Sequence, residues 1–493
     1  MLPTLPAVLF TICLFTSLSG FSQVKVEYKI SRSQGLFNFV QAITGDVNQA
    51  PGLSEIFNKS SFNKPELQST LSLYKSLLPA LNRSNLPLDE RPIPGRYPGR
   101  PLKDILLTQS VFSKDLADFS QRALGILPMK QHEQFFEVLK KLEPVYIELV
   151  WTKSLAELQK HKVDMEKMAL EADLNGLFAK AVVFYRANWP DDVPFTVGLY
   201  PIPFLEDFKN SSNSHSVGTV EDHGVLIGLK QQDVAGSFSV IFHEICHSLY
   251  DSQSADFMKN LSLYFKESAS PFRDSAYKWF NEAAATAIGN GWVFATVSKG
   301  QKLSLWYNDP IIDGYAKEIY PLTREYINLG KPLDRTFVNQ AVSLFARKFP
   351  ESIYLYKDQL HELTFIHQGS VLKSSEARDY FVSHFSISGF SGSAPLDHPK
   401  TIQSANADRS TLFLVFNNSE TKQLHNLIAT VPFLKKNLLT LLGLKNRSYF
   451  AALDENARTY VVVRAENKLD FVAALDKMKA QLRIDPKVPV QNF

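Results

Sequence analysis

The sequence feature with the clearest chemistry is a pentad of the form His-Glu-x-x-His, made up of His243, Glu244, Ile245, Cys246 and His247. Two imidazoles four residues apart on a helix project from one face and can bind the same zinc ion. The glutamate beside the first histidine can then act as a general base toward a metal-activated water. The alternative is a buried helix in which both histidines only form hydrogen bonds.

Apolar residues around the pentad predict the helix that it needs. They recur at spacings of three and four and form a stripe of Phe238, Ile241, Phe242, Ile245 and Leu249. Ser237, which follows Gly236, is the expected N-cap. We expect Cys246, which is rotated by about 100° from His247, to be a small buried apolar group.

A third zinc ligand is expected from the next strongly helical stretch, residues 279–288. Catalytic zinc keeps three protein ligands and one open position for water. Glu282 offers a carboxylate oxygen, and the alanines that follow it would let this helix pack closely against the first. Taken alone, Asn281 and Glu282 would be an ordinary polar step on an alanine-rich helix.

Together, the pentad and the Asn281-Glu282 pair resemble the gluzincin metallopeptidases over residues 225–288. The resemblance implies a zincin-like catalytic domain with a small mixed sheet. It also implies one Zn²⁺ per chain, held by His243, His247 and Glu282, with Glu244 as the general base. The implied substrate is a peptide or a protein.

Two alternative functions stay open beside a zinc-dependent peptidase. One is a zinc hydrolase that acts on small amides. The other is an exported peptide-binding or structural protein with a vestigial zinc site. The presence of Glu244 together with a complete set of three ligands argues against the vestigial site.

A strand is expected just before the zinc helix, within residues 223–230. In enzymes of this type, that strand usually forms the edge of the substrate cleft. Val225, Leu226 and Ile227 are therefore the expected substrate-edge residues, to which an extended peptide would add through backbone hydrogen bonds. The alternative is an interior strand that touches no ligand.

Peptide hydrolysis also needs a donor for the tetrahedral oxyanion, often a tyrosine or a histidine in such enzymes. Tyr320, on an expected downstream helix, is the candidate, and Tyr315 lies on the same helix. Packing is the alternative role for either residue, because the chain contains 18 tyrosines.

Ligating histidines usually donate their second N–H group to a carboxylate or a carbonyl. Asn281 and Asp251 are the candidates for orienting the imidazoles, although Asp251 could equally be solvated near the helix end. Four other histidines are expected to have structural roles. His215 and His223 precede the zinc helix, and His361 and His367 are six residues apart, on opposite faces of any helix.

The N-terminus predicts export from the cytoplasm. Residues 1–22 contain no charged side chain and include an apolar run, which predicts a signal peptide cleaved between Ser22 and Gln23. The alternative is an uncleaved anchor, although the run is short for a membrane span. We expect no span in the mature chain and a secreted or periplasmic location. Cys246 would then be the only cysteine left, so no internal disulfide is expected.

Composition bounds the remaining possibilities. The chain of 493 residues is 45% hydrophobic and 12% aromatic, which predicts well-packed globular domains. Its formal net charge of +3 gives no reason to expect nucleic acid or an anionic membrane as a partner. The oligomeric state is left open.

The predicted fold class is α+β and predominantly helical, with three parts after the signal peptide. Residues 23–190 are expected to be a mainly helical N-terminal region, 191–385 the metallopeptidase domain with a helical subdomain, and 396–493 a small α+β module. Two segments are expected to lack regular structure and to divide the chain. Residues 85–101 are rich in Pro and Gly, and residues 386–395 are rich in Gly and Ser. In the last part we expect a strand at 411–416, a hairpin of 449–453 with 459–463, and a helix at 469–482.

Overall fold

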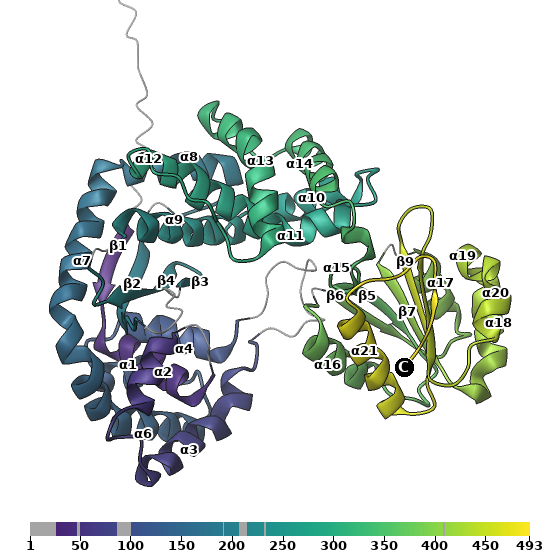
Figure 1. Ribbon diagram of the computed structural model, residues 1–493, viewed down its shortest axis with the longest axis horizontal. Coiled ribbons are helices and arrows are strands. Elements are labelled where there is room, and N and C mark those ends of the chain that lie inside the picture. The colour runs from purple at the N-terminus through teal and green to yellow at the C-terminus, as the bar shows by residue number, and fades with distance from the viewer. Residues whose placement is uncertain are drawn as a thin grey trace, which may run out of the picture.

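The computed structural model describes residues 26–46, 50–85, 100–190, 192–206, 214–230, 233–387, 389–407 and 410–493. These residues form an α+β fold that is mostly helical and contains two separate sheets, so the predicted fold class is confirmed (Figure 1). The predicted signal peptide and its cleavage site lie outside the described residues. Within the described ranges, none of the helices combines the length and the apolar character that a membrane span requires.

The first sheet has four strands in the order β1-β2-β4-β3. Their bounds are β1 (Val26–Ile30), β2 (Phe195–Pro203), β3 (Ser214–Val217) and β4 (Val220–Ile227). Strands β1, β2 and β4 are parallel, whereas β3 runs antiparallel to β4 at one edge. The region predicted as mainly helical therefore also supplies a strand, β1, which pairs with a strand far along the chain.

Helices cover both faces of this sheet. One face carries α1 (Arg32–Thr44), α2 (Pro51–Asn58), α3 (Pro65–Leu81), α4 (Leu102–Val111), α5 (Leu116–Arg122) and α6 (Met129–Tyr146). The other carries α7 (Thr152–Glu171) and α8 (Leu174–Tyr185), and a π-helical turn, η2 (Ile147–Trp151), joins α6 to α7. Strand β2 serves both cores, because side chains alternate along a strand. Val197 and Leu199 enter the core with α7, and Tyr200 and Ile202 enter the core with α1.

The chain after the sheet continues on the α7 side. It forms α9 (Val234–Asp251), α10 (Ala255–Lys266), α11 (Arg273–Thr286), a π-helical segment η3 (Ala287–Val293), α12 (Phe294–Val297), α13 (Pro310–Asn328) and α14 (Arg335–Lys348). The helix α9 contains the pentad, and α11 with η3 contains the alanine-rich stretch. Both belong to the same hydrophobic core.

Residues from Ser352 onward form a separate C-terminal lobe (Figure 1). Its strands are β5 (Glu362–Ile366), β6 (Gly389–Ser393), β7 (Thr411–Phe416), β8 (Ser448–Leu453), β9 (Thr459–Arg464) and β10 (Val490–Asn492), in the order β10-β8-β9-β7-β5-β6. Strands β6, β5, β7 and β9 are parallel, and β8 and β10 are antiparallel additions.

Helices also cover both faces of the second sheet. Helices α16 (Ser374–His384) and α21 (Lys468–Gln481) pack on one face, and α17 (Pro399–Ala407), α18 (Thr421–Thr430), α19 (Pro432–Lys436) and α20 (Leu438–Leu442) lie on the other. Short helical turns complete the lobe: η4 (Ser352–Tyr354), α15 (Tyr356–Gln359) and η5 (Asn418–Glu420). The predicted strand at 411–416, the hairpin and the helix at 469–482 are confirmed as β7, β8–β9 and α21.

The predicted boundary between residues 385 and 396 is wrong. Strands β5 and β6 both belong to the C-terminal sheet, where β5 lies between β6 and β7. His361 lies just before β5 and His367 just after it, so the residues between the two histidines form a strand. Leu363 and Phe365 are buried in the core that the sheet forms with α16 and α21.

A buried histidine beneath the first sheet gives a testable pH dependence of stability. His161 of α7 is 1% exposed, and burial, followed by the nearby His223, lowers its pKa to about 4. Because this value lies below the unfolded value of about 6.5, protonation favours the unfolded chain. His161 therefore does not change the free energy of unfolding above pH 6.5. As the pH falls from 6.5 toward 4, its protonation in the unfolded chain lowers that free energy. The full loss is about 3 kcal/mol.

We expect His161→Leu to remove this loss. The free energy of unfolding of wild type relative to the variant should fall by about 2 to 3 kcal/mol between neutral pH and pH 4.5. Asp222, whose pKa burial raises to about 6, titrates in both proteins and cancels in the comparison. A wild-type-minus-variant difference that does not change with pH would contradict the assignment.

Candidate metal centre

The helix that carries the pentad begins earlier than its sequence predicts. Helix α9 starts at Val234, and the Asp233 carboxylate accepts a hydrogen bond from Gly236 N at 2.8 Å. Ser237 therefore lies inside the first turn and is not the N-cap. Asp233 is the N-cap instead, because its short carboxylate reaches the free N–H groups at the helix start. The predicted apolar stripe is buried, and so is Cys246, whose thiol pKa burial raises.

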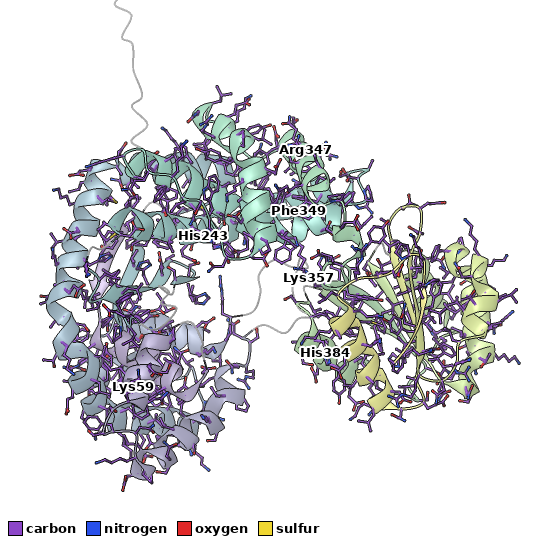
Figure 2. The ribbon with its side chains drawn as sticks, viewed as in Figure 1. Lys59, His243, Arg347, Phe349, Lys357 and His384 are labelled. Atoms are coloured by element: carbon purple, nitrogen blue, oxygen red, sulfur yellow. The ribbon has the colours of Figure 1, made fainter. Side chains whose placement is uncertain are left out.

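The three predicted metal ligands lie together. His243 Nε2 and His247 Nε2 are 3.0 Å apart, and Glu282 Oε2 lies 3.6 Å and 3.5 Å from these two atoms. Ligands about 2.1 Å from a tetrahedral ion are separated by about 3.4 Å. The three donor atoms therefore have the spacing that one metal ion requires. Among the described residues, this is the one His, Cys and carboxylate group of that kind. Figure 2 marks His243 on α9.

The outer nitrogens of both imidazoles have partners that set the tautomers. His247 Nδ1 is 3.2 Å from Asn281 Oδ1, which can only accept, so Nδ1 carries the proton. His243 Nδ1 is 3.4 Å from Thr286 Oγ1. If both Nδ1 atoms donate, both Nε2 atoms present lone pairs to each other across 3.0 Å, which a shared cation would stabilise. The predicted contact of Asn281 is present, and Thr286 is an additional contact that the sequence did not indicate.

The electrostatics of the site favour a cation. Burial alone would raise the pKa of Glu282, but His247 and His243 outweigh it and hold that pKa well below its usual value. Burial would likewise lower the pKa of His247, but Glu282 and then Glu244 raise it to about 10. Glu282 Oε2 is buried and accepts no hydrogen bond that meets normal geometry. This oxygen points at the two imidazoles and has the position of a metal ligand.

Close packing of two helices brings Glu282 to the histidines. Ala283, Ala284 and Ala285 of α11 are fully buried, as their small size suggested. In η3, a Cβ atom added to Gly289 would lie 2.7 Å from both His243 N and Ser239 O. The backbone of η3 therefore touches the backbone of α9 at His243, one of the three candidate ligands. π-helical segments of this kind occur often at functional sites.

We expect Gly289→Ala to separate α9 from η3. The new methyl group would meet backbone atoms, which cannot rotate away, so the free energy of unfolding should fall by about 1 to 3 kcal/mol. Metal affinity should also fall. Chemical denaturation and a chelator competition measure the two effects. Gly443→Ala is the matched control, since its nearest neighbour is Leu439 O at 3.1 Å, far from the metal centre. Equal effects of the two substitutions would contradict the role given to Gly289.

The tyrosine beside the metal centre is Tyr307, not the predicted Tyr320. The Tyr307 ring stacks on His243 with centroids 5.9 Å apart. Burial, followed by the charge of Glu282 and a hydrogen bond to it, raises the Tyr307 pKa. Tyr320 instead packs edge-on against Trp306 at 5.2 Å, and Tyr315 is fully buried.

A loop explains why the sequence did not indicate Tyr307. The residue lies between α12 and α13, where no periodic pattern exists. Asp313 Oδ1 accepts hydrogen bonds from Trp306 N at 2.7 Å and from Tyr307 N at 3.3 Å, which fixes the loop. The available signal was an aspartate six residues after a tyrosine, which is too common to be specific.

The predicted role of Asp251 is wrong. Its carboxylate forms an ion pair with Arg100 at 2.8 Å rather than a hydrogen bond to an imidazole. Arg100 Nη1 also donates to Ser216 O at 3.5 Å. Asp251 is the last residue of α9, where a cation from the N-terminal region can reach it and the metal site is more than a turn away. The pair ties the end of the segment 85–101 to α9 and β3, while residues 86–99 lie outside the described ranges.

The predicted substrate-edge residues Val225, Leu226 and Ile227 lie at the end of β4 and have one strand partner, β2, among the described residues. Strand β4 pairs with β2 along its whole length, and its first four residues pair with β3 on the other side. Val225 and Ile227 are only 2% and 8% exposed and Leu226 packs on the other core, so all three are core residues. The outer strand is β3, which has one strand partner among the described residues.

His215, His223 and His367 contact polar side chains of the chain itself. His223 Nδ1 is 2.9 Å from the buried Glu221, and His215 Nε2 is 3.4 Å from Asp104. Burial would lower the pKa of His215, but Asp104 outweighs it and raises that pKa. His367 Nε2 contacts Ser374 Oγ at 2.7 Å.

Comparison with known proteins returns no relative: no protein-family model, no curated protein and no solved structure matches the chain. The arrangement of His243, His247, Glu282 and Glu244 is therefore the basis for assigning a function.

Proposed function

We propose that this protein is a zinc-dependent peptidase. The observation that carries the proposal is the meeting of His243 Nε2, His247 Nε2 and Glu282 Oε2 within 3.6 Å, with Glu244 next in sequence to the first ligand. Two imidazoles and one carboxylate are a ligand set of catalytic zinc sites, which leave one position open. The mixed sheet has an antiparallel edge strand, and the proposed ligands lie on the helices α9 and α11. Both features are consistent with a zincin-like catalytic domain.

A zinc ion held by these residues would polarise the scissile carbonyl and lower the pKa of a water molecule. Glu244 would take a proton from the attacking water and pass it to the nitrogen of the leaving amine. Asn281 and Thr286 would hold the two imidazoles in the tautomers that present Nε2 to the centre. Tyr307, beside His243 and Glu282, would donate its hydroxyl hydrogen to the developing oxyanion.

The proposed substrate is an extended peptide. Its backbone would add to the outer side of β3, the edge strand whose partner β4 lies next to the zinc helix in the chain. The apolar, uncharged N-terminal residues support an exported location, either secreted or periplasmic.

Metal analysis and peptide cleavage together test the proposal. We expect one zinc per chain, cleavage of a mixed peptide library, and loss of cleavage with a chelator followed by recovery with zinc. A protein that binds zinc but cleaves no peptide of the library would contradict the peptidase assignment and favour a vestigial site. Turnover of small amides alone would favour the amide hydrolase.

We expect Tyr307→Phe to lower kcat by about 100-fold, because one oxyanion donor is lost. The KM and the zinc content should change little, since the ring still stacks on His243. Tyr320→Phe is the matched control and should leave kcat near the wild-type value, because Tyr320 packs on Trp306. Equal losses in both variants would contradict the assignment of Tyr307.

A further inference from the structure

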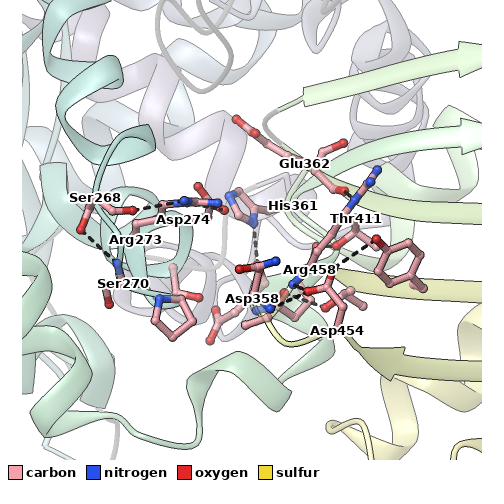
Figure 3. Close-up of a pocket in the computed structure, with 18 of the residues that line it drawn as sticks. Ser268, Ser270, Arg273, Asp274, Asp358, His361, Glu362, Thr411, Asp454 and Arg458 are labelled. Atoms are coloured by element: carbon pink, nitrogen blue, oxygen red, sulfur yellow. Dashed lines mark hydrogen bonds and ion pairs between the residues drawn. The ribbon is translucent and has the colours of Figure 1, made fainter. Parts of the chain in front are cut away.

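The cavity between the catalytic part and the C-terminal lobe is lined by side chains that already pair within the chain (Figure 3). Its volume is about 620 Å³. Asp358 forms an ion pair with Lys278 at 3.3 Å, and Arg273 Nη1 donates to Ser268 O at 3.1 Å. Arg458 donates to two backbone carbonyl oxygens. Because these groups join parts of the chain to each other, the cavity indicates no ligand.

The outer edge of the first sheet, at β1, offers binding groups that the described chain does not use. Strand β1 ends the order β1-β2-β4-β3, on the side of the molecule away from the C-terminal lobe (Figure 1). Its one strand partner among the described residues is β2. Within the same ranges, no backbone group of Val26–Ile30 forms a backbone hydrogen bond on the side away from β2. Such an edge can pair with a strand from another molecule.

An apolar groove lies beside this edge. Its volume is about 380 Å³, and it is lined by the start of β1, the end of α7 and the start of α8. Leu170 of α7 lines the groove and is 84% exposed. Val163 is 61% exposed and lies two turns earlier on the same face of α7. Figure 1 shows α7 on the outside of the molecule, next to β1. The free strand edge is therefore flanked by exposed apolar side chains, as interaction surfaces often are.

The sequence of β1 is complementary to itself. It reads Val26, Glu27, Tyr28, Lys29 and Ile30. If two copies pair antiparallel about Tyr28, each Glu27 lies opposite Lys29 of the other copy, and each Val26 lies opposite Ile30. The side chains of Glu27 and Lys29 are 45% and 39% exposed, and within one chain their charged atoms are 3.8 Å apart. Opposite charges directly across an antiparallel strand pair are stabilising, whereas like charges are destabilising.

We propose that β1 pairs with β1 of a second copy of this protein, so that the two four-stranded sheets join edge to edge in a symmetric dimer. A two-fold axis perpendicular to the joined sheet leaves both copies of α7 on the same face. Leu170 and Val163 of the two copies then approach each other, and their burial adds hydrophobic stabilisation. The opposite edge, β3, stays free beside the metal centre. The dimer does not depend on peptidase activity.

Sedimentation equilibrium of the full-length protein tests the proposal, and we expect a dimer at micromolar concentration. Glu27→Lys sets two lysines of one copy against the acidic positions of neither, so both cross-strand charge pairs become repulsive. The dissociation constant of the dimer should then rise by at least about tenfold. Lys29→Glu should have the same effect, although it also removes the contact of Lys29 with the ring of Phe112 at 4.8 Å.

The double variant Glu27→Lys/Lys29→Glu decides between lost charge pairing and a damaged strand. It restores opposite charges across the two strands, so it should dimerise as the wild type does. Glu455→Lys, a charge reversal on an exposed turn of the C-terminal lobe, is the control and should leave the dimer unchanged.

Three outcomes would overturn the proposal. They are a wild type that stays monomeric at high micromolar concentration, a folded Glu27→Lys protein that dimerises as the wild type does, and a folded double variant that stays monomeric. If a charge variant fails to fold, Leu170→Glu replaces it, because that side chain is already 84% exposed. Leu170→Glu should also weaken the dimer, and an unchanged dimer in that variant would contradict the proposed interface.

Discussion

Replacing Glu244 with glutamine is expected to lower kcat for peptide cleavage by about 1,000-fold or more, while one zinc ion per chain is still bound. Glutamine has nearly the same shape but cannot take a proton from water at neutral pH. Glu244 is 9% exposed, and glutamine fills the same space, so the isosteric change should leave the packing intact. Steady-state kinetics and metal analysis on the same preparation measure both quantities.

Glu325→Gln, on the exposed side of α13, is the control for the loss of a carboxylate as such. It should cleave peptides at the wild-type rate. A Glu244→Gln protein that keeps more than about a tenth of wild-type kcat would exclude Glu244 as the general base. Loss of zinc in that variant would instead mean that Glu244 supports the metal ligands.

The second large effect is expected in metal affinity. Glu282→Gln should weaken zinc binding by more than about 100-fold, since removal of even an orienting neighbour of a ligand costs about 10- to 100-fold. The substitution removes the negative charge that faces both imidazoles at 3.5 Å and 3.6 Å. Competition with a chromophoric chelator measures the dissociation constant.

Asn281→Ala provides a graded comparison on the same helix. The substitution leaves all three proposed ligands in place and removes the acceptor of His247 Nδ1. Zinc affinity should therefore fall by about tenfold, near the lower end of the 10- to 100-fold range for orienting residues. If Glu282→Gln binds zinc as tightly as wild type, Glu282 is not a ligand. If Asn281→Ala weakens zinc binding more than Glu282→Gln does, the assignment of Glu282 as a ligand and of Asn281 as a residue that only orients His247 is wrong.

Features that depend on local periodicity were predicted well from the sequence. The side-by-side placement of the candidate ligands His243 and His247 follows from their spacing on one helix, and the stripe that buries this helix is equally local. Glu282 required the next helix to pack alongside, which its alanines suggested. Asp233 was missed as the cap because the helix gains one more turn that lacks an apolar stripe.

Features that depend on distant pairing were not predicted. The outer position of β3 is set by the order in which strands pair, and that order is not written in any one segment. Strand β6 was missed because Gly389, Ser391 and Gly392 suggest a loop, yet a short edge strand tolerates such residues. Tyr307 reaches the site on an irregular loop, where no spacing rule applies.

The attachment of the C-terminal lobe to α11 has a consequence for biosynthesis. Lys278 and Trp279 bind Asp358, and Glu282 lies about one turn further along the same helix. During translation Glu282 is made well before Asp358, and domains fold largely in the order of their synthesis. We therefore expect the metal ligands to be present but loosely held in a nascent chain, and zinc to be captured tightly only after the last lobe has folded onto α11.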